Sequence, residues 1–217
     1  MKINRLLMTA IFSFVGVLAV AQSWMMQPQG PVNEFSAMEG TSVLNYNLQI
    51  ERDIHSRAGF GPVFYIFPDN KLDNNQALEL AGNLDLVNII KEYGGRIMVV
   101  NPSSDKWQEQ DLEDFRRLIG MGSSPTNVKV IGIGSGATFV NRQLVATELA
   151  GVIAGIVSID GEPGKICRLP VPAFIGGKNA AKAAKPYQTT SDSAPADPLQ
   201  KVVVNTDKKA SLETLFA

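Results

Sequence analysis

The stretch VKVIGIGSGATFV, residues 128–140, gives the clearest indication of the fold. An apolar run is followed by Gly132, Gly134 and Gly136, and then by residues with helical periodicity. A strand, a tight glycine turn and a helix in this order are typical of an α/β protein. The same turn carries chemistry in some proteins, while in others its glycines only let the helix pack closely on the strand.

Apolar runs on either side of this stretch predict the other strands of a mostly parallel sheet. The runs are 63–67 (VFYIF), 96–100 (RIMVV), 128–133 (VKVIGI), 152–159 (VIAGIVSI), 171–175 (VPAFI) and 201–204 (KVVV). Strands that are apolar on both faces are buried between layers of helices. Helical periodicity over 78–90, 111–120 and 137–149 supplies those helices. The predicted fold class is therefore α/β, with helices on both faces of the sheet.

The remaining segments are assigned from their composition. Residues 42–50 alternate between apolar and polar, which predicts a half-exposed edge strand. Residues 22–41 and 188–198 are rich in turn-forming residues and are expected to be loops. Residues 208–217 are expected to begin a helix with Ser211 as its N-cap.

The N-terminal 21 residues have the pattern of a secretory signal peptide. Lys2 and Arg5 precede an apolar run, which ends in small residues before a cleavage site after Ala21. The alternative is an uncleaved membrane anchor, since the apolar run approaches spanning length. We expect a secreted or periplasmic protein that has no membrane contact after cleavage, with its domain over residues 42–217.

Composition excludes several classes of function. The 217 residues are 45% apolar and 19% charged, with a formal net charge of −1, which argues against nucleic acid as a partner. The chain has one cysteine, Cys167, and one histidine, His55, so neither a disulfide framework nor a multi-cysteine or histidine-rich metal site is expected. We expect no metal or other cofactor, and Cys167 is interpreted as a small buried apolar residue.

A nucleophile elbow is the first functional interpretation of the glycine turn. Such a turn needs small residues two positions before and after the nucleophile. With Ser135 as the nucleophile, the bulky Ile133 occupies the earlier position. The spacing of Gly132 and Gly136 instead centres the turn on Gly134, which has no side chain to attack a substrate. Ser135 is then the next residue, whose backbone N–H normally helps to hold the oxyanion.

A dinucleotide-binding turn is the second functional interpretation. Gly132, Gly134 and Ala137 match the glycine fingerprint, and Asp160 ends the next strand, where an acid would bind the ribose. However, two strand–helix units come before this turn, whereas the fingerprint usually opens its domain. Export would also separate the protein from cellular nicotinamide cofactors.

The order of the elements resembles that of a known family. Segments 61–70, 94–107, 128–145, 152–164 and 171–179 resemble secreted α/β-hydrolase esterases of the polyhydroxybutyrate-depolymerase-like and feruloyl-esterase-like group. The resemblance covers residues 42–217. It implies a serine esterase that cleaves a small-molecule or polymer carboxylic ester through an acyl-enzyme intermediate.

The site residues that this resemblance implies are only partly present. Where the family has His-Gly in the oxyanion loop, this chain has Pro68 and Asp69. Gly134, Ser135 and Gly136 occupy the nucleophile turn, and Asn179 stands near the position of the family acid. Asp192 and Asp197 are weaker substitutes for that acid. The family histidine follows the acid, but no histidine follows Ser135, and His55 lies far upstream.

Three functional hypotheses follow. The first is a secreted serine-esterase-like hydrolase with Ser135 as nucleophile, whose triad is incomplete in this chain. It requires a protein that continues past Ala217 and supplies the histidine. The second is a degenerate member of the family, a non-catalytic module that binds a ligand or a partner. The third is a dinucleotide-binding protein. The oligomeric state is not indicated by the sequence.

Overall fold

The apolar runs form one eight-stranded sheet in the computed structural model, which describes residues 33–47, 61–121, 128–192 and 201–206. The strands are β1 (Glu34–Ala37), β2 (Val43–Asn47), β3 (Val63–Phe67), β4 (Arg96–Val100), β5 (Val128–Ile133), β6 (Ile153–Ile159), β7 (Ala173–Gly176) and β8 (Val202–Asn205). All six predicted core strands are present, and the bounds of β3, β4 and β5 are those expected from the sequence. The predicted α/β class is confirmed.

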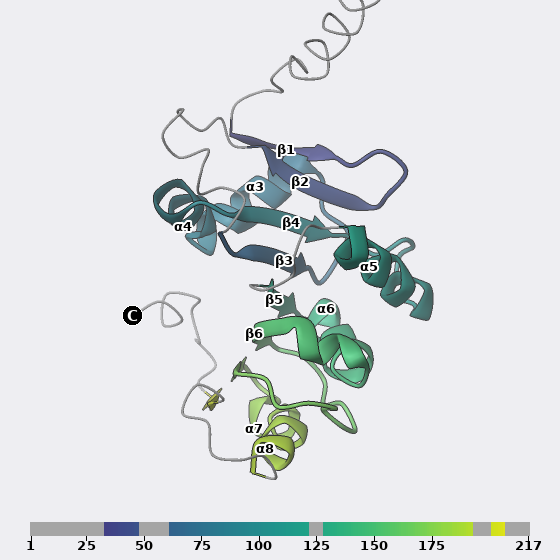
Figure 1. The fold of residues 1–217 in the computed structure, drawn as a ribbon, viewed down its shortest axis with the longest axis vertical. Helices are drawn as coiled ribbons and strands as arrows, with labels where there is room; N and C mark the ends of the chain where they lie inside the picture. Colours follow the sequence, from purple (N-terminus) through teal and green to yellow (C-terminus); the bar gives the residue numbers. More distant parts are fainter. Residues whose placement is uncertain (1–32, 48–60, 122–127, 193–200, 207–217) are drawn as a thin grey trace, which may run out of the picture. The chain divides into compact units, whose positions relative to one another are not determined.

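The order of the strands is β1-β2-β4-β3-β5-β6-β7-β8. From top to bottom, Figure 1 shows the first six of these strands in this order. Strands β1, β2 and β4 pair antiparallel, and β4, β3, β5, β6, β7 and β8 pair parallel. The chain crosses from β4 over β3 to reach β5, so the sheet has its topological switch point between β3 and β5. Ligands bind at such points in open α/β sheets, beyond the carboxyl ends of the strands.

Helices cover the sheet, and an apolar core lies on each face. The helices are α3 (Asn74–Asn83), α4 (Leu86–Tyr93), α5 (Glu109–Met121), α6 (Ser135–Phe139), the π-helical turn η1 (Val140–Leu144), the 3-10 helix η2 (Glu148–Val152), α7 (Ala180–Ala183) and α8 (Lys185–Asp192). Helices α3 and α4 pack with the β1–β2 hairpin in one core, and α5 to α8 contribute to the other. The two cores explain why the central strands are apolar on both faces.

Two expectations for the N-terminal part of the domain are wrong. Residues 22–41 are not all loop, because β1 lies within them, where Phe35 is buried and its ring lies 5.2 Å from that of Tyr46. Strand β2 is not an edge strand, because it pairs with β1 on one side and β4 on the other. This contact between Phe35 and Tyr46, which are opposite each other on β1 and β2, stabilises β1, and the turn-rich composition of the segment gives no sign of it.

The helical pattern over 78–90 forms two helices and not one. The break lies at Asp85, whose φ of 56° is left-handed. Leu84 and Leu86 flank it and are both almost completely buried. On an unbroken helix, residues two positions apart point to different sides. The break therefore lets both leucines enter the core.

The loop expected over 188–198 is also partly wrong, since α8 extends to Asp192. Tyr187 is buried in the core, and the Thr190 hydroxyl donates a 2.7 Å hydrogen bond to the backbone carbonyl of Cys167. These tertiary contacts hold residues of low helix propensity in a helix.

Several sequence expectations lie outside the described residues. They are the signal peptide over 1–21, the first part of the segment 22–41, the environments of His55 and Asp197, and the helix over 208–217. Among the helices of the described part of the chain, none has the length and apolar character needed to span a membrane.

Candidate functional site

The glycine turn lies at the switch point of the sheet, between β5 and α6. Gly134 connects the two elements with φ 55° and ψ −116°, a backbone conformation that side chains with a Cβ rarely adopt. Helix α6 begins at the next residue, Ser135. The apex of the turn is therefore Gly134, as the spacing of the outer glycines predicts.

The outer glycines of the turn are required by close packing. A Cβ on Gly132 would lie 2.6 Å from the Cα of Ala137, and one on Gly136 would lie 2.1 Å from the backbone oxygen of Phe67. The first contact brings helix α6 against its own strand. The second brings it against the end of β3. The turn thus has the geometry of a nucleophile elbow, with glycine at the position of the nucleophile.

The side chain of Asp69 occupies the space above the apex. Its Oδ1 accepts a 2.6 Å hydrogen bond from the backbone N–H of Ser135. A Cβ built on Gly134 would lie 2.3 Å from the same oxygen. The hydroxyl of Ser135 donates to the backbone carbonyl of Asp69. Asp69 and Ser135 therefore hold the loop after β3 against the start of α6.

This arrangement removes two requirements of acyl transfer. The apex has no nucleophilic side chain, and the N–H that would hold an oxyanion already binds the Asp69 carboxylate. Pro68, the neighbouring residue in the predicted oxyanion loop, has no N–H, and its carbonyl accepts a 3.2 Å hydrogen bond from Trp107 Nε1. Ser135 remains an exposed hydroxyl beside the apex, and among the described residues it contacts the backbone and not a base.

A pocket of about 470 Å³ opens directly over this turn. Three elements line it: the loop after β3, the loop after β4, and one side of the helical segment formed by α6 and η1. Its residues are Asp69, Asn70, Asp105, Lys106, Trp107, Ser135, Thr138, Phe139, Arg142 and Gln143. Of these residues, only Asp69 and Ser135 are expected from the sequence. The helical spacing of residues 135, 138, 139, 142 and 143 is a signal that could have identified the others on the helix.

The loop after β4 is fixed by its own hydrogen bonds. The buried carboxylate of Asp111 accepts from the backbone N–H of Ser103 at 2.9 Å and from that of Gln108 at 2.7 Å. The Trp107 ring stacks on Phe139, with 4.8 Å between ring centroids and an interplanar angle of 26°. The wall formed by residues 103–108 is thus preorganised, which lowers the entropic cost of binding a ligand.

Asp111→Ala is expected to destabilise the protein by about 2 kcal/mol, because two backbone N–H groups lose a charged acceptor at a buried site. The matched control is Asp114→Ala on the same helix, where the carboxylate is exposed and a change within about 0.5 kcal/mol is expected. Urea unfolding followed by circular dichroism measures both. Equal effects of the two substitutions would contradict the conclusion that the Asp111 carboxylate stabilises the loop after β4.

The expected acid position, Asn179, is not among the residues that line the pocket over the turn. Asn179 precedes α7, and its amide donates a 3.0 Å hydrogen bond to Glu162 Oε1. Asp160 directly follows β6 and has a φ of 56°, and its carboxylate accepts from the backbone N–H of Lys178 at 3.1 Å. Asn179 follows β7, as the sequence expects, and its role as the acid position stays a prediction. Asp160 fixes the loop after β7. Within residues 33–47, 61–121, 128–192 and 201–206, no three metal-ligating side chains come together.

The dinucleotide interpretation also meets an obstacle at this turn. A pyrophosphate would need the free N–H groups at the start of the helix. The Asp69 carboxylate binds the first of them and brings a negative charge to the place of the phosphate. The glycine at position 132 is explained by its contact with Ala137.

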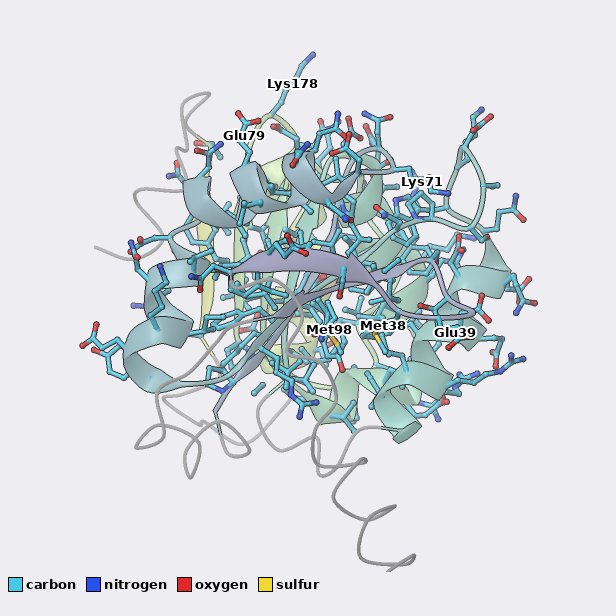
Figure 2. The ribbon with its side chains drawn as sticks, turned by 90° about the horizontal axis from the view of Figure 1, so that it is seen from above. Met38, Glu39, Lys71, Glu79, Met98 and Lys178 are labelled. Carbon is cyan, nitrogen blue, oxygen red and sulfur yellow. The ribbon has the colours of Figure 1, made fainter. Side chains whose placement is uncertain are left out.

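A second cavity, of about 740 Å³, lies between the β1–β2 turn and α5. Met38, Glu39 and Lys71 are on its wall, and Figure 2 labels all three. Its buried polar residues already have partners: Asn101 bonds both backbone groups of Leu72, and Asp111 bonds the loop after β4. Although this cavity is larger, the pocket over the turn is the better candidate site, because it lies at the switch point.

Cys167 is buried, as the sequence predicts, and its thiol contacts the backbone oxygen of Leu169 at 3.1 Å. Burial raises the pKa of this thiol from 9.0 to about 11. It lies outside the pocket, which agrees with a structural role and not a catalytic one.

This pKa predicts a loss of stability at alkaline pH. The thiol ionises at lower pH in the unfolded chain than in the folded chain. The contribution of the buried thiol to the free energy of unfolding is therefore constant below pH 9 and is lost between pH 9 and about 11. Over this window the urea midpoint of the wild type should fall more steeply than that of Cys167→Ala, which lacks the ionising group. Parallel curves for the two proteins would disprove the assignment.

Comparison with known proteins yields structural similarity only. The sequence matches no protein-family model and no curated protein. The fold is similar to an α/β hydrolase enzyme from a Medee basin deep-sea metagenome library, with 15% identity, a TM-score of 0.51, and coverage of 82% of this chain and 81% of that one. It is also similar to an esterase/lipase from an uncultured bacterium, with 10% identity, a TM-score of 0.51, and coverage of 81% and 74%. A hormone-sensitive lipase from a metagenome library gives 11% identity, a TM-score of 0.50, and coverage of 76% and 75%. Together with the parallel sheet and the elbow-like turn, these similarities show that the chain has the α/β-hydrolase fold.

Proposed function

We propose that this protein is a non-catalytic ligand-binding protein built on the α/β-hydrolase fold, and that it binds a small molecule in the pocket over the glycine turn. The observation that carries the proposal is the contact between Asp69 and the turn. The carboxylate binds the N–H of Ser135 and fills the space where a nucleophile at residue 134 would stand. The pocket itself is retained, with a rigid wall and an aromatic surface.

A serine esterase that uses Ser135 is the second candidate. It is supported by the similarity of the fold to esterases and lipases and by the exposure of Ser135 at the pocket. Its weakness is chemical, because a serine hydroxyl needs an adjacent base to take its proton. In the described part of the chain, this hydroxyl donates to the carbonyl of Asp69, which is not such a base.

Active-site labelling separates the two candidates. We expect that a fluorophosphonate probe does not label the native protein above the level of Ser135→Ala, and that neither protein hydrolyses p-nitrophenyl acetate or butyrate faster than buffer. Labelling or turnover that is lost in Ser135→Ala would overturn the non-catalytic proposal and establish the esterase. The binding activity is tested by thermal shift against soluble small molecules, with Trp107→Ala as the control that alters the pocket.

We also propose that the protein is exported, on the strength of the charged, apolar and small-residue pattern in residues 1–21. N-terminal sequencing of the protein from its native source is expected to begin at Gln22. A sequence that begins at the initiator methionine would refute cleavage.

A further inference from the structure

We infer that the ligand of the pocket over the glycine turn is a neutral saccharide unit, either a free oligosaccharide or the end of a polysaccharide. The inference rests on the proposed binding function and gives the ligand a chemical class. It follows from the charge, the unpaired polar groups and the aromatic surface of the pocket.

The charges that line the pocket cancel. Two carboxylates, Asp69 and Asp105, lie with two cations, Lys106 and Arg142. An anionic ligand would meet both carboxylates, and a cationic ligand would meet both cations. A neutral ligand avoids either repulsion.

Several polar side chains of the pocket have no partner among the described residues. The carboxylate of Asp105, the ammonium of Lys106 and the amide of Gln143 are exposed and make no hydrogen bond or ion pair there. An acyl chain or another apolar ligand would bury such groups without satisfying them, which is costly. Hydroxyl groups both donate and accept hydrogen bonds, so a polyhydroxyl ligand satisfies a carboxylate, an ammonium and an amide at once.

Trp107 provides a surface on which a sugar ring can stack. The ring is half-buried, lines the pocket, and stacks on Phe139. Its indole N–H is already bound to the carbonyl of Pro68 at 3.2 Å, which fixes its orientation. The apolar C–H face of a pyranose packs on such a surface while its hydroxyl groups reach the polar rim. The pocket volume of about 470 Å³ lies within the usual range for a small-molecule site.

The hydrogen bonds of the turn itself argue against an acyl ligand. The N–H of Ser135 is taken by Asp69, and the hydroxyl of Thr138 donates to the carbonyl of Gly134 and accepts from the N–H of Glu162. The groups that would recognise an ester carbonyl are thus satisfied within the protein. The groups that stay unpaired lie on the rim, where a saccharide would place its hydroxyls.

The test uses the full chain after removal of its signal peptide. Trp24 and Trp107 are the only tryptophans, so a Trp24→Phe background makes intrinsic fluorescence report on Trp107 alone. The probes are cellotriose, xylotriose and maltotriose, titrated to about ten millimolar by fluorescence and calorimetry. Trigalacturonic acid serves as the charged comparison and hexanoate as the acyl comparison. Pull-down with insoluble cellulose and xylan distinguishes a polymer end from a free oligosaccharide.

The expected result is that at least one neutral trisaccharide or polymer binds and shifts the Trp107 emission. Asp105→Asn and Trp107→Ala should each weaken that binding by about tenfold or more, the loss of one good contact. Glu79→Gln is the matched control for the first substitution, because this carboxylate projects from α3 on the outside of the molecule (Figure 2), and no change is expected.

The alternative outcomes are distinct. If hexanoate or trigalacturonic acid binds in a Trp107-dependent way and no neutral saccharide does, the saccharide inference is overturned while the binding function stands. If no probe binds and the fluorophosphonate labels Ser135, both proposals fail. If no neutral saccharide, soluble or polymeric, binds at these concentrations, the inference is likewise overturned.

Discussion

Gly136→Ala is expected to destabilise the protein by about 3 kcal/mol, although the same change inside a helix usually stabilises it. The added Cβ would lie 2.1 Å from the backbone oxygen of Phe67 and 2.6 Å from that of Pro68. Phe67 is the last residue of β3, in the centre of the sheet, and Pro68 follows it directly, so neither oxygen can move without shifting the strand end. Helix α6 must then separate from β3, and the pocket over the turn must open.

The measurement is the free energy of unfolding from urea titration at neutral pH. Gly82→Ala is the matched control, because Gly82 lies within α3 and a Cβ there would meet no atom within 4 Å. The control is expected to gain about 0.5–1 kcal/mol from helix propensity. If Gly136→Ala gained stability in the same way, the close contact between α6 and β3 would be refuted.

Gly134→Ser, which restores a hydroxyl at the apex of the turn, is expected to cost about 3 kcal/mol and to produce no esterase. Part of the cost is backbone strain, since the residue must keep a φ of 55°. The rest arises because the new Cβ would lie 2.3 Å from Asp69 Oδ1, which must move and release the N–H of Ser135.

A double-mutant cycle with Asp69→Ala separates these contributions. Asp69→Ala alone is expected to cost about 1 kcal/mol, the value of an exposed hydrogen bond to a charged acceptor. The double variant should be more stable than the sum of the single effects predicts by about 1–2 kcal/mol, because the collision no longer exists. Strict additivity would mean that Asp69 does not occupy the nucleophile position.

The activity of the same variants tests the proposed function. Neither Gly134→Ser nor the double variant is expected to hydrolyse p-nitrophenyl butyrate, because a hydroxyl without a base remains a poor nucleophile. Fluorophosphonate labelling of the double variant at residue 134 would show that a base lies within reach of the turn. In that case Gly134 and Asp69 alone would account for the lack of esterase activity in this chain.

The central part of the fold is predictable from sequence because its determinants are local. Runs such as VFYIF at 63–67 are apolar at every position, which only a strand covered on both faces can satisfy. The spacing of Gly132 and Gly136 also identifies Gly134 as the apex, since close approach of two backbones leaves no room for a side chain. Strand β1 and helix α8 are not predictable in this way, because Phe35 holds β1 through Tyr46 on the paired strand β2, and Tyr187 holds α8 through Asn141, 46 positions away.

The sequence by itself determined the α/β class, the central strands and the absence of a nucleophile at residue 134, because periodicity and glycine spacing are properties of short segments. Only the tertiary structure decided what the turn contacts. Asp69 and Ser135 are separated by 66 positions and meet because β3 and β5 are parallel neighbours that end at the same edge of the sheet. Trp107 reaches the same pocket from the loop after β4. Strand order brings these groups together, and strand order depends on how whole elements pack and not on the residues within any one of them.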